Sequence, residues 1–85
     1  MQIIYTSQFY RGYKKLPDEV KILAESKEKI FRKDPSNPVL KTHKLHGQFN
    51  GFWSFSINSK YRVIFEFGEK SKIYFHAVGD HSVYD

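Results

Sequence analysis

Four histidines and one arginine are the residues whose types fit proton transfer at a phosphate. Histidine exchanges protons near neutral pH, because its ordinary pKa is about 6.5. Arg62 has a planar fork that holds two phosphate oxygens while it stays protonated. A base, a cation and an acid of these types suffice to cleave RNA through its own 2′-hydroxyl, without a metal. The histidines are His43, His46, His76 and His81.

These histidines form no typical metal site. Only His43 and His46 are close in sequence, and an i, i+3 pair in an apparent loop without a nearby carboxylate is not a zinc pattern. The chain has no cysteine, so a thiolate site and a disulfide are both excluded. Gly-rich phosphate loops and Cys–His pairs are also missing. We therefore expect no metal and no cofactor.

One strand and two helices precede the residues that could carry chemistry. The pattern predicts a strand over residues 2–6 and a helix from an N-cap at Ser7 to Pro17. A second helix, which Asp18 can cap, should follow and end at the Pro-rich run at residues 34–38. Both helices have apolar positions at helical spacing, with Lys27 laying its stem along the second stripe. These apolar positions are Phe9, Tyr13, Leu16, Val20, Leu23, Ala24, Ile30 and Phe31.

Three strands are expected after Asn50, where the pattern changes to a period of two. Residues 61–67 and 72–79 alternate in the same way as the segment that begins at Phe52. Trp53 alternates with large apolar residues, so we assign it to the core rather than to base stacking. The helices should cover the aromatic face and leave a face of Ser, Arg, Glu and His side chains open.

The register of these strands follows from keeping the apolar faces together. A two-residue turn would set Phe55 opposite Arg62, so we expect a three-residue connection through Lys60. Keeping the apolar faces together requires that opposed residues have numbers that are both even or both odd. Arg62 should therefore lie beside His76 or Val78 on the last strand. The expected pairs are Phe55 with Val63 and Ser56 with Arg62.

Length and charge set the broad class. Eighty-five residues build one domain, residues 1–85, with one core. A formal net charge of +5 favours polyanionic partners. No secretory signal and no apolar stretch of about 18 residues is present. We expect a cytoplasmic protein that does not enter a membrane.

Two segments carry a resemblance that covers the whole chain: KLHGQFNGFWSFSINSKYRVIFEF and the terminal GDHSVYD. They resemble the RelE/ParE superfamily of toxins from bacterial type II toxin–antitoxin pairs, most closely its YoeB and YafQ branches. The resemblance implies an α+β fold of order β-α-α-β-β-β, in which an N-terminal strand and a helical hairpin pack on one face of a small antiparallel sheet. It also implies an endoribonuclease that cuts mRNA in the ribosomal A site, touches ribosomal RNA and is blocked by an antitoxin.

The resemblance assigns roles to four residues. His43 falls at the position of the general base, Arg62 on the sheet arginine that stabilises the phosphate, His81 near the general acid and Tyr84 near the terminal aromatic. Ser56 and Lys60 stand where one branch has a histidine and an aspartate, and the usual His-Tyr pair is opened to His81-Ser-Val-Tyr84. We also expect RNA contacts from Lys41, Lys44, His46, Lys60 and His76.

Other interpretations stay open. A ParE-like gyrase inhibitor without nuclease activity shares this fold, as does an inactive relative that binds RNA or an antitoxin. Arg62 could merely pair with Glu66 on the sheet face, and His43 and His81 could be idle or could exchange roles. His76 fits a sheet-face neighbour better than a catalyst, and the lysines could form only a soluble rim.

Overall fold

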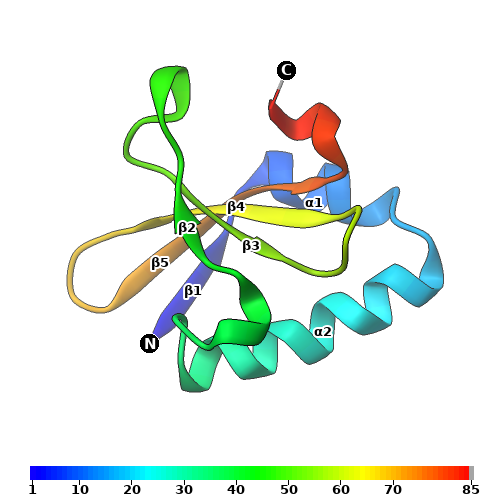
Figure 1. Ribbon diagram of the computed structural model, residues 1–85, viewed down its shortest axis with the longest axis horizontal. Coiled ribbons are helices and arrows are strands. Elements are labelled where there is room, and N and C mark those ends of the chain that lie inside the picture. The colour runs from blue at the N-terminus through cyan, green and yellow to red at the C-terminus, as the bar shows by residue number, and fades with distance from the viewer. Residues whose placement is uncertain (85) are drawn as a thin grey trace.

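The computed structural model describes residues 1–84, and it contains two helices and five strands in this range (Figure 1). Three short 3-10 turns, at Pro38–Leu40, Gly47–Phe49 and His81–Tyr84, connect or follow them. The α+β class is confirmed, and the predicted strands and helices occur in the predicted order, with one further strand, β2, between α2 and β3. In chain order the elements are β1 (Gln2–Tyr5), α1 (Ser7–Lys14), α2 (Asp18–Lys33), β2 (His43–Lys44), β3 (Trp53–Ser56), β4 (Arg62–Phe67) and β5 (Lys72–Gly79).

The sheet has the strand order β1-β5-β4-β3-β2 and is mixed. The last four strands pair antiparallel, as predicted, but β1 runs parallel to β5. The expectation of an antiparallel sheet is therefore wrong for β1, where the long connection through both helices allows a parallel crossover. Strand β2 was not predicted, because two residues are too short to show a period.

The predicted register between β3 and β4 is confirmed, since Phe55 pairs with Val63 and Ser56 with Arg62. The expectation for the next strand is wrong, because Arg62 pairs with Gly79 rather than with His76 or Val78. The pairing of β4 with β5 shifts by one residue between Ile64 and Phe65. Such a bulge changes the parity of the opposed residues, so an argument from alternation alone fails beyond it.

Both helices cover the aromatic face of the sheet. Phe31 of α2 is fully buried and contacts Phe55, Phe65 and Phe75 at ring-centroid distances of 5.0, 4.9 and 5.4 Å. Phe9 of α1 lies 5.5 Å from Phe75. These rings supply much of the apolar area that so small a core needs.

Three details of the helices differ from prediction. Thr6, not Ser7, caps α1, because its Oγ1 accepts a hydrogen bond from the Phe9 N–H at 3.1 Å. Asp18 begins α2 without capping it, and Pro17 holds the cap position. Leu23 was expected in the core but is 39% exposed, because it lies on the flank of the stripe that faces the sheet.

The opposite face of the sheet is less open than predicted. Ser54 is fully buried, and Ile64 and Ala77 are also buried. The hydroxyl groups of Ser54 and Tyr84 lie 3.1 Å apart, so the C-terminal turn lies on this face. Figure 1 shows this turn in red at the opposite end of the molecule from α2. The face remains accessible around Arg62.

Candidate active site

A hollow of about 650 Å³ is lined by Arg62, the first residue of β4. Segments far apart in the sequence build it: α2, the turn after it, β2, the end of β3 and the β3–β4 connection. Two of the predicted catalytic residues, His43 and Arg62, line this hollow together. Its lining residues are Lys27, Val39, Lys41, His43, Ser56, Asn58, Ser59 and Arg62.

The β3–β4 connection fixes the position of Arg62. The side-chain oxygen of Asn58 accepts hydrogen bonds from the backbone N–H groups of Lys60 and Tyr61, at 2.9 and 2.8 Å. This local pattern closes the turn in the way that Asx turns do. Arg62 follows at once, opposite Ser56, with its side chain among the residues of the hollow.

The Arg62 guanidinium has no carboxylate partner among residues 1–84. Its Nη2 lies 3.5 Å from the Ser59 carbonyl oxygen, and its Nε is buried without a hydrogen bond. The alternative pairing with Glu66 is wrong, because the Glu66 carboxylate accepts a hydrogen bond from His76 Nε2 at 3.0 Å. A buried N–H that lacks a partner costs free energy unless a ligand satisfies it. The guanidinium is therefore a cation without a counter-ion among residues 1–84, and it lines the hollow.

His43 lies on β2 opposite Ser54 and is exposed. Its Nδ1 is 2.9 Å from the carbonyl oxygen of Lys41, a residue with a left-handed φ of 52° that closes the preceding turn. A carbonyl oxygen only accepts hydrogen bonds, so Nδ1 of the neutral ring carries the hydrogen. This contact leaves the lone pair on Nε2, where it can accept a proton.

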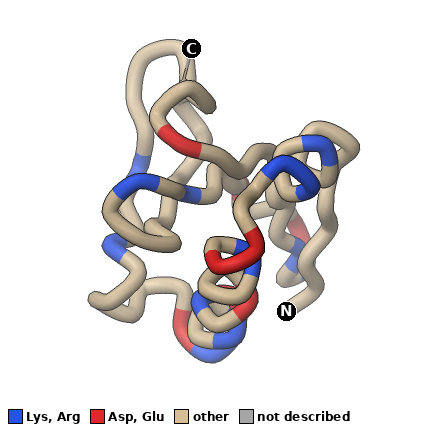
Figure 2. The backbone as a smooth tube through the Cα atoms, turned by 90° about the vertical axis from the view of Figure 1, so that its right-hand side faces the viewer, with Lys and Arg blue, Asp and Glu red and all other residues tan. Residues whose placement is uncertain are grey.

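The charge around the hollow is positive. Lys27, Lys41 and Arg62 all line it, and no Asp or Glu occurs in the sequence between Asp34 and Glu66. Figure 2 shows the mixture of acidic and basic positions on α2, in contrast with this part of the chain. None of the residues that line the hollow is acidic, and a hollow lined by cations attracts phosphate groups.

Sequence reasoning did not assign Lys27 to the site. We placed it as a stem along the apolar stripe of α2, where it is indeed half-buried, but it also reaches the hollow. Asn58 and Ser59 were also missed as lining residues. Lys27 could have been identified because it is a cation within an otherwise apolar helix face. A lysine at such a position buries its methylene groups and extends its ammonium group to the nearest polar edge.

The structure does not place His81 and Tyr84 among the residues that line the hollow. His81 is exposed on the last turn, two residues after Gly79, which pairs with Arg62, and its ring centroid lies 6.2 Å from that of Tyr84. A hydrogen bond from the backbone N–H of Ser82, at 2.9 Å, holds the pKa of Asp80 below its usual value. An ionised carboxylate therefore precedes His81 in this turn.

The remaining predicted RNA contacts are spread over the surface. Lys44 lies over the half-buried Trp53 ring, 5.5 Å from its centroid, and with His46 it lines a second hollow of about 460 Å³. Lys60 lies over the Tyr61 ring at 5.4 Å. His76 contacts Glu66 and the Phe52 ring instead of the hollow. Among the predicted RNA-binding residues, Lys41 is the one that lines the hollow with Arg62.

Residues 1–84 contain neither a cluster of metal ligands nor a membrane-spanning helix. No group of three or more His, Asp or Glu side chains comes together as metal ligands would. None of the helices in this range has the length and apolar character that crossing a membrane requires.

Comparison with known proteins identifies relatives of this chain. Residues 5–79 match a family described as the RelE-like toxin of the type II toxin–antitoxin system HigB. A search of the curated proteins found no match. The matched family agrees with the resemblance drawn from the sequence.

Solved structures of similar toxins share the fold. A YoeB/ParE toxin from Agrobacterium tumefaciens has a TM-score of 0.79 at 16% identity, and the match covers 95% of this chain and 99% of that one. YafQ from E. coli strain BL21(DE3) has a TM-score of 0.73 at 21% identity, and the match covers 98% of this chain and 96% of that one. A chain of the YoeB–YefM complex from Staphylococcus aureus has a TM-score of 0.76 at 18% identity, and the match covers 95% of this chain and 97% of that one.

Proposed function

We propose that this chain, which belongs to the RelE-like toxins of type II toxin–antitoxin systems, is an endoribonuclease that cleaves messenger RNA on the ribosome. The proposal needs no metal and no cofactor. The attacking group is the 2′-hydroxyl of the RNA itself, so the products are a 2′,3′-cyclic phosphate and a 5′-hydroxyl end.

His43 is the general base in this proposal. Its Nδ1 hydrogen bond to the Lys41 carbonyl orients the ring and leaves Nε2 free to take the proton from the 2′-hydroxyl. Arg62 binds the phosphate and stabilises the charge that builds on its oxygens as the new bond forms. Lys27 and Lys41 add positive charge around the same phosphate.

His81 donates the proton to the leaving 5′-oxygen. The turn that carries it begins beside Gly79, the pairing partner of Arg62, which supports its reach to a phosphate held there. Tyr84 contacts Ser54, and this contact supports a role for Tyr84 in holding the turn on the sheet. The other predicted contacts, Lys44, His46, Lys60 and His76, bind ribosomal RNA or flanking message by charge and stacking.

The observation that carries the proposal is the state of Arg62. Arginines with a purely structural role are usually paired with carboxylates, since an unpaired buried charge is costly. Arg62 is half-buried, has no carboxylate partner among residues 1–84 and shares its hollow with His43 and two lysines. An anionic substrate explains this arrangement.

An antitoxin partner belongs to the same proposal. The S. aureus YoeB–YefM and E. coli DinJ–YafQ structures are toxin–antitoxin complexes of the same fold. A cognate antitoxin of this chain would block the basic hollow with an acidic segment. The site of action is the cytoplasm, where message and ribosomes meet.

The experiment is induction of the chain in a bacterial host without antitoxin, with mapping of the 5′ ends of cellular mRNA. Cuts within translated reading frames are expected, and Arg62→Ala should abolish them. Arg11→Ala is the matched control, because Arg11 is exposed on α1 outside the hollow and its loss should leave the cuts unchanged. Growth arrest with intact message would refute the nuclease and indicate another target, such as gyrase.

A further inference from the structure

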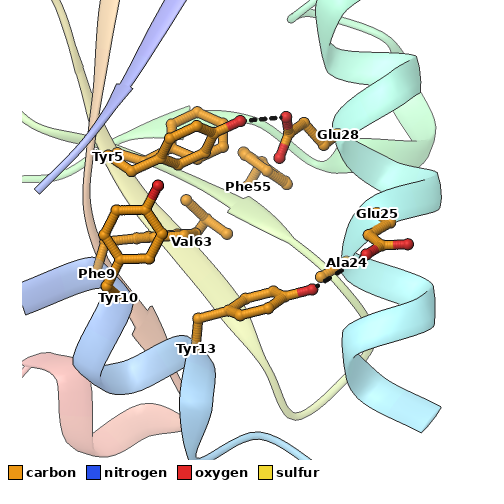
Figure 3. A pocket seen from close by; sticks show the side chains of 10 residues that line it. Tyr5, Phe9, Tyr10, Tyr13, Ala24, Glu25, Glu28, Phe55 and Val63 are labelled. Atoms are coloured by element: carbon orange, nitrogen blue, oxygen red, sulfur yellow. Dashed lines mark hydrogen bonds between the residues drawn. The ribbon is translucent and has the colours of Figure 1, made fainter. Parts of the chain in front are cut away.

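A further cavity, of about 270 Å³, lies between the two helices on the helix-covered face of the sheet (Figure 3). Phe55 and Val63 form part of its floor. Aromatic rings from β1 and α1 form one wall, and two carboxylates of α2 stand on the other. The proposed nuclease does not use this cavity.

Three tyrosines define the aromatic wall. Tyr5 lies 5.8 Å from Tyr10 between ring centroids, and Phe9 stacks on Tyr13 at 6.0 Å with an interplanar angle of 20°. Tyr10 is 53% exposed although it lines the cavity, so much of its ring is accessible to a ligand. The faces of such rings carry partial negative charge and attract cations.

The carboxylates of Glu25 and Glu28 close the opposite side. Tyr5 donates a hydrogen bond to Glu28 at 2.5 Å, and Tyr13 donates one to Glu25 at 3.4 Å, so the two contacts bridge the gap to α2 at two places (Figure 3). Burial and these carboxylates raise the pKa of both tyrosines, which agrees with a negative environment.

Cations of the protein itself already lie at the edges of the cavity. Lys21 Nζ is 5.9 Å from the Tyr13 ring centroid, and Arg32 Nη2 is 3.3 Å from Glu28. Neither residue lines the cavity, and no Lys or Arg among residues 1–84 lies within 4.0 Å of the Glu25 carboxylate. The exposed ring of Tyr10 and the Glu25 carboxylate are therefore left for an incoming cation.

We propose that this cavity binds a small organic cation, an ammonium group on an apolar body. The apolar floor suits the body, and the tyrosine faces and Glu25 suit the charge. The cavity, at about 270 Å³, has room for a small amine of this kind.

The test compares choline with 3,3-dimethylbutan-1-ol, which has the same shape but carries carbon in place of the charged nitrogen. Each is titrated into the full chain while the NMR signals of the tyrosine rings are followed. Choline should saturably shift the signals of Tyr5, Tyr10 and Tyr13, with about tenfold higher affinity than the alcohol. Equal affinity would overturn the proposal and leave only an apolar gap between helices.

Two variants make the test specific. Glu25→Gln keeps an acceptor for Tyr13 but removes the charge, so it should weaken choline severalfold and leave the alcohol unaffected. Glu19→Gln removes a carboxylate from the exposed side of the same helix, outside the cavity, and should change neither affinity. Choline binding that ignores Glu25→Gln, or that shifts signals elsewhere in the protein, would contradict the assignment.

Discussion

The contact between Ser54 and Tyr84 should have an energy that depends on which partner is removed. The Ser54 hydroxyl is fully buried, and Tyr84, at 3.1 Å, is its partner among residues 1–84. Tyr84→Phe keeps the ring and its contact with Phe49 but leaves a buried hydroxyl without a hydrogen bond. The expected loss in the free energy of unfolding is about 1–3 kcal/mol.

The reverse change should cost less. Tyr84 is only half-buried, so in Ser54→Ala its hydroxyl can turn to water, and the loss should stay below about 1 kcal/mol. In the double variant no buried hydroxyl is left unpaired. It should therefore be more stable than Tyr84→Phe alone, with a coupling energy of about 1–2 kcal/mol.

Urea unfolding of the four proteins in this cycle measures the effect. A loss of 1 kcal/mol corresponds to a fall in Tm of roughly 4–8 °C for a chain of this size, so calorimetry gives an independent reading. Additive losses, or a Tyr84→Phe protein as stable as the parent, would refute the idea that this contact holds the C-terminal turn on the sheet.

Three further predictions test the core, the helix contact and the charge of the site. Phe31→Ala should lower the free energy of unfolding by about 3–5 kcal/mol in urea titrations, whereas Ile22→Ala, at a 66% exposed position, should change it by less than about 0.5 kcal/mol. Burial and its hydrogen-bonded carboxylate raise the pKa of Tyr5 above 10, so its contribution to stability is present below pH 10 and is lost as the pH rises through the folded-state pKa. Tyr5→Phe should make stability less sensitive to pH above 10, and an unchanged alkaline profile in thermal melts would contradict this. Lys27→Gln should weaken binding of the chain to ribosomal RNA and reduce its salt dependence by about one ion, while Lys29→Gln, outside the hollow, should do neither.

The sequence predicted most of the sheet, and two of the four residues given catalytic roles from the sequence, His43 and Arg62, line one hollow. Alternation identified the strands and paired Ser56 with Arg62, because one buried face allows only one parity. Alternation could not reveal the bulge near Phe65, which places Gly79 opposite Arg62. A bulge changes which residues of two strands are paired, and the sequence of either strand alone does not show that change.

The site itself depended on contacts between distant segments. His43 and Arg62 line the same hollow, and Lys27 lines it too, from a helix face that a sequence pattern assigns only to the core. The turn that carries His81 is held on the sheet by the contact between Tyr84 and Ser54. Such a contact depends on tertiary packing, and the periodicity of the sequence does not predict it. Residue type therefore indicated the chemistry, and tertiary structure decided which groups share one space.

If the RNA supplies its own nucleophile at Arg62, a message that lacks the 2′-hydroxyl should resist cleavage. Ribosomes carrying a defined message are incubated with the purified chain or its Arg62→Ala variant, with the A-site codon built from either ribonucleotides or 2′-deoxynucleotides. The parent protein should cut the ribose message to 2′,3′-cyclic phosphate and 5′-hydroxyl ends and leave the deoxy message whole, and the variant should cut neither. Cleavage of the deoxy message at the same rate, or ends with a free 3′-hydroxyl, would contradict the mechanism.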